Sequence, residues 1–211
     1  MLTAGLPRSS RPTNDPRNGP MDAFESVIAT ILEHRGYWVR SSFKVDLSKA
    51  EKVQLGKPSL PRPELDLVAY KGHGNVIRVV ECKSYLDSAG VSIAAFDGTN
   101  DKFAERFKLL LRDDWREVVE RRLVQQLCET GLTERRPSVL WCLAAGKVKS
   151  AADEVALNEW FSRRGWEFWG PNWVADGVRA LANGSYENDV ATIVSKLITR
   201  QSKRSPRPSG T

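Results

Sequence analysis

Two acidic residues and a lysine stand where the strands of a hairpin would normally carry apolar side chains. Asp66 lies in one apolar run, and Glu81 and Lys83 close the next one. The glycine-rich residues 71–75 between the two runs predict a tight turn. Folding about this turn brings Asp66 within one residue of Glu81 on the neighbouring strand. Carboxylate oxygens are ligands that Mg²⁺ prefers, so the hairpin predicts a site for a hard divalent cation.

The same residues resemble the signature of the PD-(D/E)XK nuclease superfamily, which has the restriction-endonuclease-like fold. Asp66, followed by Glu81, Cys82 and Lys83 at the end of the next strand, matches that motif. The resemblance implies that Asp66, Glu81 and the carbonyl group of Cys82 ligate Mg²⁺, with Mn²⁺ able to substitute. It also implies that Lys83 assists the attacking water. Glu25 matches the glutamate on the preceding helix that often completes such a site.

The match to the family pattern has one departure and one alternative. Two residues, one of them Glu64, separate Pro63 from Asp66, where the family has an adjacent Pro-Asp pair. Whether Glu64 contributes to the site is therefore open. A bare Glu-x-Lys motif arises by chance roughly once in a chain of this length, so the motif alone is a weak signal. Its one occurrence in this chain, at residues 81–83, closes a predicted strand. The alternative is a solvated salt-bridge ladder in which Lys83 simply pairs with Glu81.

The segments before the hairpin predict a helix, a strand and an irregular connection. Residues 21–35 carry a helical apolar stripe, residues 37–47 alternate loosely as a strand does, and residues 48–63 are polar and proline-containing. Glu25 lies beside the apolar stripe and can face inward. As a first-turn glutamate it would also be favoured by the helix dipole, whatever its function.

The segments after the hairpin predict a substrate-contacting loop, a long helix and a buried strand. The loop 86–100 leaves the second strand beside the proposed metal, where it can touch substrate. Residues 102–130 predict a helix that breaks near Asp113 and Asp114. The continuous apolar run 138–145 is typical of a buried central strand.

The charged face of the long helix has two interpretations. Alternating acidic and basic residues favour a solvated face with helix ion pairs, and part of the face can instead line a wall that binds phosphates. Whether Gln125 or Gln126 reaches the site, as a glutamine does in some relatives of the family, is open.

The last third of the chain predicts a helix, a short strand and two closing helices, at 151–164, 166–169, 171–182 and 186–198. Four tryptophans are concentrated in this part: Trp160, Trp166, Trp169 and Trp173. We expect them to pack the C-terminal helices on the sheet. Stacking on unpaired bases is the alternative.

The order of these elements predicts an α/β fold in which helices flank a mixed central β-sheet. The resemblance, which covers residues 21–146, implies an αβββαβ restriction-endonuclease-like core, to which extra C-terminal helices are added. We expect a single domain at 21–199 between disordered basic tails at 1–20 and 200–211. The tails carry net charges of +2 and +4 out of a total of +6, so the domain between them is neutral.

Composition limits where the protein can act. No apolar run is long enough for a transmembrane helix, and the N-terminus lacks an apolar stretch of the signal-peptide type. The three cysteines, Cys82, Cys128 and Cys142, are odd in number and widely spaced, which argues against a disulfide framework or a zinc site. We therefore expect a cytoplasmic protein with reduced thiols and no membrane association.

Together these features predict a Mg²⁺-dependent phosphodiesterase that cleaves nucleic acid, with DNA as the expected substrate. The alternative is a catalytically inactive protein that keeps the nuclease fold as a nucleic-acid-binding or scaffold module. A hydrolase of another phosphoester is a third interpretation. The superfamily includes restriction enzymes, junction resolvases, repair nucleases and defence effectors, and no pattern here separates them. Symmetric cutting of a duplex would favour a homodimer, although no sequence feature indicates one.

Overall fold

The computed structural model describes three ranges of the 211-residue chain: 22–133, 136–185 and 187–202. The expected tail at 1–20 lies outside these ranges, as do residues 203–211 of the second expected tail. The last helix, α8 (Val190–Ser202), starts later than expected and continues three residues past the expected domain boundary at 199.

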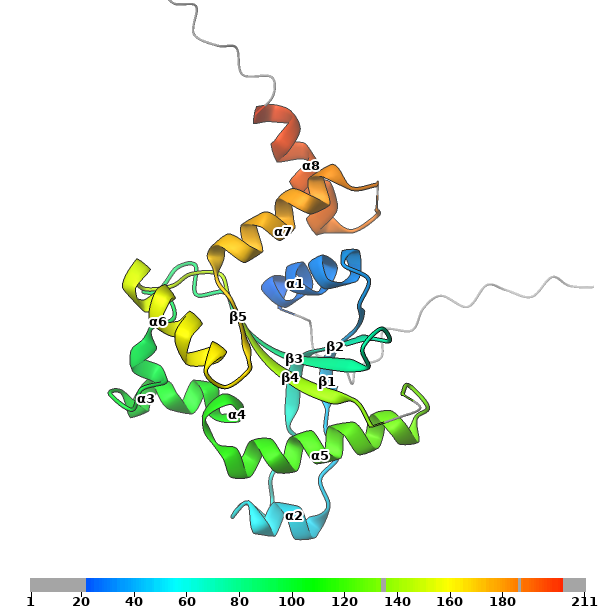
Figure 1. Cartoon of the computed structure of the whole chain (residues 1–211), viewed down its shortest axis with the longest axis vertical. Coiled ribbons are helices and arrows are strands. Elements are labelled where there is room, and N and C mark those ends of the chain that lie inside the picture. Colours follow the sequence, from blue (N-terminus) through cyan, green and yellow to red (C-terminus); the bar gives the residue numbers. More distant parts are fainter. Residues whose placement is uncertain (1–21, 134–135, 186, 203–211) are drawn as a thin grey trace, which may run out of the picture.

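A five-stranded mixed sheet forms the centre of the molecule, with its strands in sequence order. The strands are β1 (Trp38–Lys44), β2 (Glu64–Lys71), β3 (Val76–Lys83), β4 (Ser138–Ala145) and β5 (Glu167–Trp169). The first three run antiparallel, and β4 and β5 join the sheet in parallel. With helices on both faces, this arrangement confirms the predicted α/β class (Figure 1). The run 138–145 forms an interior strand, as its apolar composition predicts.

Each face of the sheet is covered by its own helices (Figure 1). The helices α1 (Ala23–His34) and α7 (Pro171–Asn183) pack on one face, where α1 contributes Ile28 and Leu32 to the core. The long helix α5 (Asp113–Glu129) covers the other face, together with α6 (Ala151–Ser162). None of the helices in the described ranges combines the length and apolar character needed to cross a membrane.

The predicted hairpin is confirmed, and its register decides which residues meet. Lys71 pairs with Val76 at the turn, and Leu67 pairs with Val80 farther along the strands. Asn75 and Gly74 close the turn with φ of 50° and 83°, the left-handed region that glycine and asparagine tolerate best. The ladder ends at Leu67 and Val80, and the same register continued by one step would set Asp66 opposite Glu81.

The connection between β1 and β2, expected to be irregular, contains a short helix, α2 (Lys49–Gln54). Ser48 and Glu51 form a capping box: the Glu51 N–H donates to Ser48 Oγ at 3.2 Å, and the Ser48 N–H donates to Glu51 Oε2 at 2.8 Å. No residue of α2 is buried. The helix therefore lacks the apolar periodicity on which the sequence prediction depended.

The helix predicted at 102–130 is divided into several pieces. Short turns, α3 (Asp101–Ala104), η2 (Glu105–Phe107) and α4 (Lys108–Leu111), precede α5. Arg112 separates α4 from α5 with an extended backbone, φ −103° and ψ 107°, which confirms a break beside Asp113. A single 3₁₀ turn, η1 (Ile93–Ala95), lies in the loop after β3.

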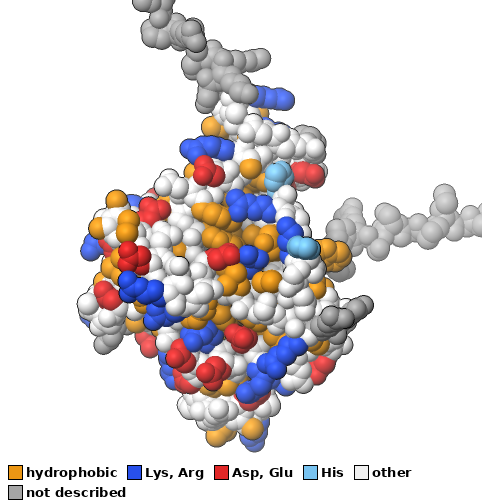
Figure 2. All heavy atoms as spheres, viewed as in Figure 1, with side chains coloured by type: hydrophobic (Ala, Val, Ile, Leu, Met, Phe, Trp, Pro, Cys, Tyr) orange, Lys and Arg blue, Asp and Glu red, His pale blue; other side chains and the backbone are white. Residues whose placement is uncertain are grey.

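Charged side chains of both signs are interspersed over the face drawn in Figure 2, with hydrophobic side chains between them. This distribution is in keeping with the neutral net charge of residues 21–199.

Candidate active site

Asp66 lies at an irregular position of β2. The ladder between β1 and β2 pairs the residues on both sides of Ser42 and Asp66, but not these two residues. Ser42 has a φ of 49°, which is uncommon for a residue other than glycine. Leu65 and Leu67, on either side of Asp66, pack into the cores on opposite faces of the sheet, although residues two apart in a regular strand share a face. The strand therefore twists at Asp66.

The Asp66 carboxylate is fixed to the end of β3 by a backbone hydrogen bond. The Cys82 N–H donates to Asp66 Oδ2 at 2.7 Å. Burial raises the pKa of Asp66 above its ordinary value, although this hydrogen bond and the nearby Lys83 ammonium oppose the rise. Asp66 is therefore held at the strand end in a setting that penalises its negative charge.

Glu81 and Lys83 form a close ion pair on the same face of β3. Lys83 Nζ lies 2.5 Å from Glu81 Oε1, and the side chains are only 21% and 20% exposed, respectively. Burial raises the pKa of Glu81, and the Asp66 carboxylate raises it further against the opposing effect of Lys83. Burial alone would lower the pKa of Lys83, but the adjacent Glu81 carboxylate raises it above its ordinary value.

Glu25, in the first turn of α1, interacts electrostatically with Asp66 and Lys83. The helix begins at the N-cap Asp22, whose Oδ1 accepts a hydrogen bond from the Phe24 N–H at 2.8 Å. Burial raises the pKa of Glu25 to about 7, and the nearby carboxylates of Asp66 and Asp22 add to the rise. Lys83 acts in the opposite direction. Asp66 and Lys83 therefore interact electrostatically with both Glu25 and Glu81.

Glu64 and Cys82 take part in this region in more limited ways. Glu64 is half exposed and pairs with Lys44 on β1 at 3.8 Å. Its charge still contributes to the raised pKa of Asp66, after the effect of burial. The Cys82 thiol is buried in the core under α1. The proposed use of its carbonyl group as a metal ligand stays a prediction.

The donor set of the site fits a small, hard cation in part. Among the described residues, no three His, Cys, Asp or Glu side chains converge in a way that would enclose a metal ion. Asp66 and Glu81 nevertheless provide carboxylates on adjacent strands, and Mg²⁺ in enzymes usually takes one or two carboxylates and fills its other positions with water and substrate phosphate. Burial is the largest cause of the raised pKa of Glu81, and repulsion by the Asp66 carboxylate adds to it. A cation bound here would relieve that repulsion.

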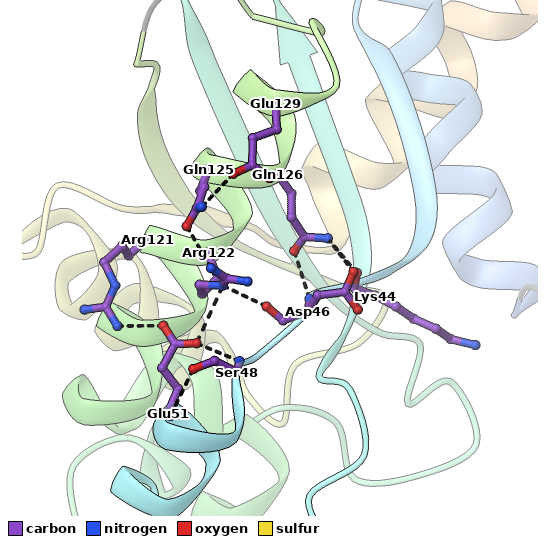
Figure 3. A network of polar contacts seen from close by, with 9 residues as sticks. All are labelled: Lys44, Asp46, Ser48, Glu51, Arg121, Arg122, Gln125, Gln126 and Glu129. Atoms are coloured by element: carbon purple, nitrogen blue, oxygen red, sulfur yellow. Dashed lines mark hydrogen bonds and ion pairs between the residues drawn. The ribbon is translucent and has the colours of Figure 1, made fainter.

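The glutamines of α5 lie in a separate polar network, drawn in Figure 3. Gln126 Oε1 accepts from the Asp46 N–H at 2.8 Å. Gln125 bonds with Arg122 and Glu129 on its own helix. The network holds the connection between β1 and β2 against α5. Both glutamines therefore have structural partners outside the candidate site.

The arginines of α5 are also held by acidic partners. Arg121 Nη2 donates to Glu51 Oε1 at 2.9 Å, and Arg122 Nε lies 3.6 Å from Glu51 Oε2 (Figure 3). Arg116 pairs with Asp113, and Arg112, directly before the helix, pairs with Asp114. These contacts favour the interpretation of a charged face with ion pairs over that of a phosphate-binding wall.

The four C-terminal tryptophans pack against the protein's own aromatic rings, as predicted. Trp160 and Trp166 lie in a cluster with Phe161, with ring centroids 5.0 to 6.3 Å apart. Trp169 and Trp173 stack on each other at 4.3 Å. The guanidinium group of Arg35 lies 4.1 Å above the ring of Trp173. Their rings are thus occupied by packing within the protein.

Comparison with known proteins finds no family model, no curated protein and no solved structure that matches the chain. Membership of the nuclease superfamily therefore stays a prediction that depends on the residues of the hairpin and on their geometry.

The sequence interpretation missed Tyr85 as a feature of the site. Tyr85 follows Lys83 by two residues and lies close enough for the two side chains to interact electrostatically. Its φ of 46° is unusual for a bulky side chain. No sequence pattern signals such a conformation, because an aromatic residue after a strand is most often ordinary packing.

Proposed function

We propose that this protein is a Mg²⁺-dependent nuclease that hydrolyses phosphodiester bonds in DNA. The observation that carries the proposal is the group of Asp66, Glu81 and Lys83 at adjoining strand ends, with which Glu25 of α1 interacts electrostatically. Buried charges of this kind are costly to maintain and are concentrated at functional sites. The order helix, three antiparallel strands, helices and a parallel strand is also the order that the nuclease resemblance implies.

Each residue has a role that its surroundings support. Asp66 and Glu81 would hold Mg²⁺ or Mn²⁺, which supplies Lewis-acid polarisation of the scissile phosphate. Lys83 would donate a hydrogen bond to the attacking water and offset the charge that develops on the phosphate. The water oxygen bonds to phosphorus as the bond to the leaving oxygen breaks.

Glu25 would hold and move a proton in this reaction. With a pKa of about 7, raised first by burial and then by its acidic neighbours, it is partly ionised near neutral pH. A carboxyl group in that range can accept a proton from the attacking water or order a water beside the metal.

The test is a cleavage assay with plasmid, linear, single-stranded and branched DNA and with RNA, each in Mg²⁺, Mn²⁺ or EDTA. Asp66→Asn, Glu81→Gln and Lys83→Ala should each lower metal-dependent cleavage by about 100-fold or more. Glu159→Gln, which alters a surface ion pair on α6, is the matched control and should cleave as the wild type does. Normal cleavage by all three site variants would reject the site.

The catalytically inactive alternative has its own support. The pair of Lys83 with Glu81 is short, and a purely structural ion pair would look the same. This alternative expects no cleavage in any metal, together with retained binding of nucleic acid. Calorimetry with Mg²⁺ separates the two further, because the inactive protein should release or absorb no heat of metal binding.

A further inference from the structure

A cavity of about 390 Å³ opens beside the end of β3. Its wall includes Tyr85, residues 88–92 of the following loop, and Phe103 and Arg106 on the segment before α4. Consecutive Cα atoms are about 3.8 Å apart, so the Tyr85 backbone lies within about 8 Å of that of Lys83. The cavity therefore begins two residues beyond Lys83, although its lining includes none of the four site residues. Its size falls within the range of about 300–1,000 Å³ that is typical of small-molecule pockets.

The lining of the cavity combines an apolar floor with aromatic and cationic groups at the rim. Val91, Ala95 and Phe107 form the buried floor. At the rim, the large apolar ring of Phe103 is 44% exposed. Arg106 provides positive charge beside it, and Lys149 adds a second cation to the lining. Among the described residues that line the cavity there is no carboxylate.

Contacts within the protein hold the aromatic rim in place. Arg106 Nη1 donates to Tyr85 Oη at 3.4 Å, and the Arg106 guanidinium lies 5.6 Å from the centre of the Phe103 ring. Tyr85 keeps a left-handed backbone, with φ 46°, a conformation that costs free energy and is often found at functional sites.

The floor is fixed to the strand next to the site. Val91 pairs with Val148 just beyond the end of β4, through hydrogen bonds from the Val91 N–H to Lys147 O and from the Lys149 N–H to Val91 O, each at 2.9 Å. A Cβ atom at Gly90 would lie 2.7 Å from the Val148 carbonyl carbon, so only glycine permits this approach. The loop is thus packed tightly against the segment that follows β4, which anchors the floor of the cavity.

We propose that this cavity binds an unpaired nucleobase of the strand whose phosphodiester bond the candidate active site cleaves. The inference rests on the proposed function and specifies its substrate as nucleic acid with single-stranded character. An apolar floor and exposed aromatic rim suit the face of a base, and flanking cations suit the adjoining phosphates. A base in an intact duplex cannot enter such a pocket unless it leaves the stack.

The experiment measures equilibrium binding by fluorescence anisotropy in EDTA, where no metal-dependent cleavage occurs. The probes are fluorescein-labelled single strands of about 12 nucleotides in DNA and RNA form, the matching blunt duplex, and an abasic single strand of the same length. Because the abasic strand changes the ligand and not the protein, it tests base recognition independently of folding. The DNA and RNA strands distinguish the two sources of an unpaired base.

Wild-type protein should bind at least one of the two single strands about tenfold more tightly than both the duplex and the abasic strand. Phe103→Ala and Arg106→Gln should each weaken that binding about 5- to 100-fold. The matched controls are Trp38→Ala, an exposed aromatic residue on β1, and Arg179→Gln, an exposed arginine on α7. Both controls should bind as the wild type does.

Equal binding of the intact and abasic strands, preference for the duplex, no binding at all, or unchanged binding by both rim variants would overturn the proposal. Its failure differs from that of the nuclease assignment. If cleavage depends on Lys83 but the protein binds intact and abasic strands equally well, only the proposed base pocket is rejected. Base-dependent binding that Phe103→Ala weakens, without cleavage in any metal, would reject the nuclease alone.

Discussion

The charges of Glu25, Asp66, Glu81 and Lys83 are not balanced within the group. Three carboxyl groups interact electrostatically with a single ammonium, and burial raises the pKa of each carboxyl group. A protein selected for stability alone would gain by replacing such a group with apolar residues of similar volume. The residues thus make the folded state sensitive both to pH and to added cations.

Glu25 should make the stability of the protein fall as the pH rises. Its pKa is raised from 4.5 to about 7 by burial and then by Asp66 and Asp22, so between these values the folded state binds more protons than the unfolded state. The stabilisation is complete below about pH 4.5 and is lost as the pH rises through 7. Because Glu25 is partly exposed, the effect should be at most about 1–2 kcal/mol.

Urea unfolding of Glu25→Gln and wild type in EDTA, at about pH 5 and about pH 8, measures this difference. The variant should gain stability relative to the wild type at the higher pH. Glu159→Gln, on the surface of α6, should track the wild type at both pH values. A constant difference between Glu25→Gln and wild type would show that Glu25 is not perturbed.

Mg²⁺ should stabilise the folded protein through the same carboxylates. At a concentration about tenfold above its Kd, a ligand that binds only the folded state adds about 1.4 kcal/mol, which raises the Tm of a domain of this size by a few degrees. Asp66→Asn and Glu81→Gln should abolish the rise seen by differential scanning calorimetry. Retention of the full rise by both variants would place the cation elsewhere.

At the scale of elements, the position of α1, the helix that carries Glu25, depends on how closely it approaches α7. Gly177 of α7 provides that approach: a Cβ atom there would lie 2.7 to 3.0 Å from three side-chain atoms of Ile31. Ile31 is buried and β-branched, so it has little freedom to move aside. Glycine in a helix costs about 1 kcal/mol relative to alanine, a cost offset here by close packing.

Gly177→Ala should therefore destabilise the protein by about 1–3 kcal/mol, despite the better helix propensity of alanine. Denaturant unfolding measures the loss. In an Ile31→Ala background, which removes the obstructing atoms, the same substitution should be neutral or stabilising. A stabilising effect of Gly177→Ala in the wild-type background would mean that the two helices separate at little cost.

The elements that the sequence could predict are those with strong apolar patterns. The hairpin, β4 and α1 have such patterns and lie where they were expected. The helix α2 has no buried residue, and only the pair of Ser48 and Glu51 in its capping box signalled it. Periodicity reports burial, so a short helix on the surface escapes it.

The candidate site likewise has features that the sequence could predict and features that it could not. Asp66, Glu81 and Lys83 could be brought together from side-chain alternation and turn length alone. The left-handed backbone of Ser42 and Tyr85 could not be predicted, because it depends on tertiary contacts and not on residue type. The cavity beside Tyr85 is lined by residues of the segment 85–107, which forms a loop and short helical turns, and by Lys149. Such segments carry no periodic pattern that could reveal a cavity.

At the scale of the whole molecule, the net positive charge lies at the two ends of the sequence. Residues 21–199 are neutral overall, and the residues on either side carry the net charge of +6. Within the body, several arginines are held by acidic partners, such as Arg163 with Glu159 and Arg179 with Asp176. Long-range attraction of phosphates therefore has to come mainly from the terminal segments.

Replacing Lys203, Arg204 and Arg207 with glutamine should weaken duplex binding at low salt and make its salt dependence shallower. Each phosphate contact contributes about −0.9 to the slope of log K against log salt, so the slope should change by up to about 2.7. Titrations in increasing salt measure it. A variant with glutamine at Arg163 and Arg179 should keep the wild-type slope, because those charges are already compensated. An unchanged slope in the triple variant, with a reduced slope in this control, would instead place the electrostatic contact on the folded body.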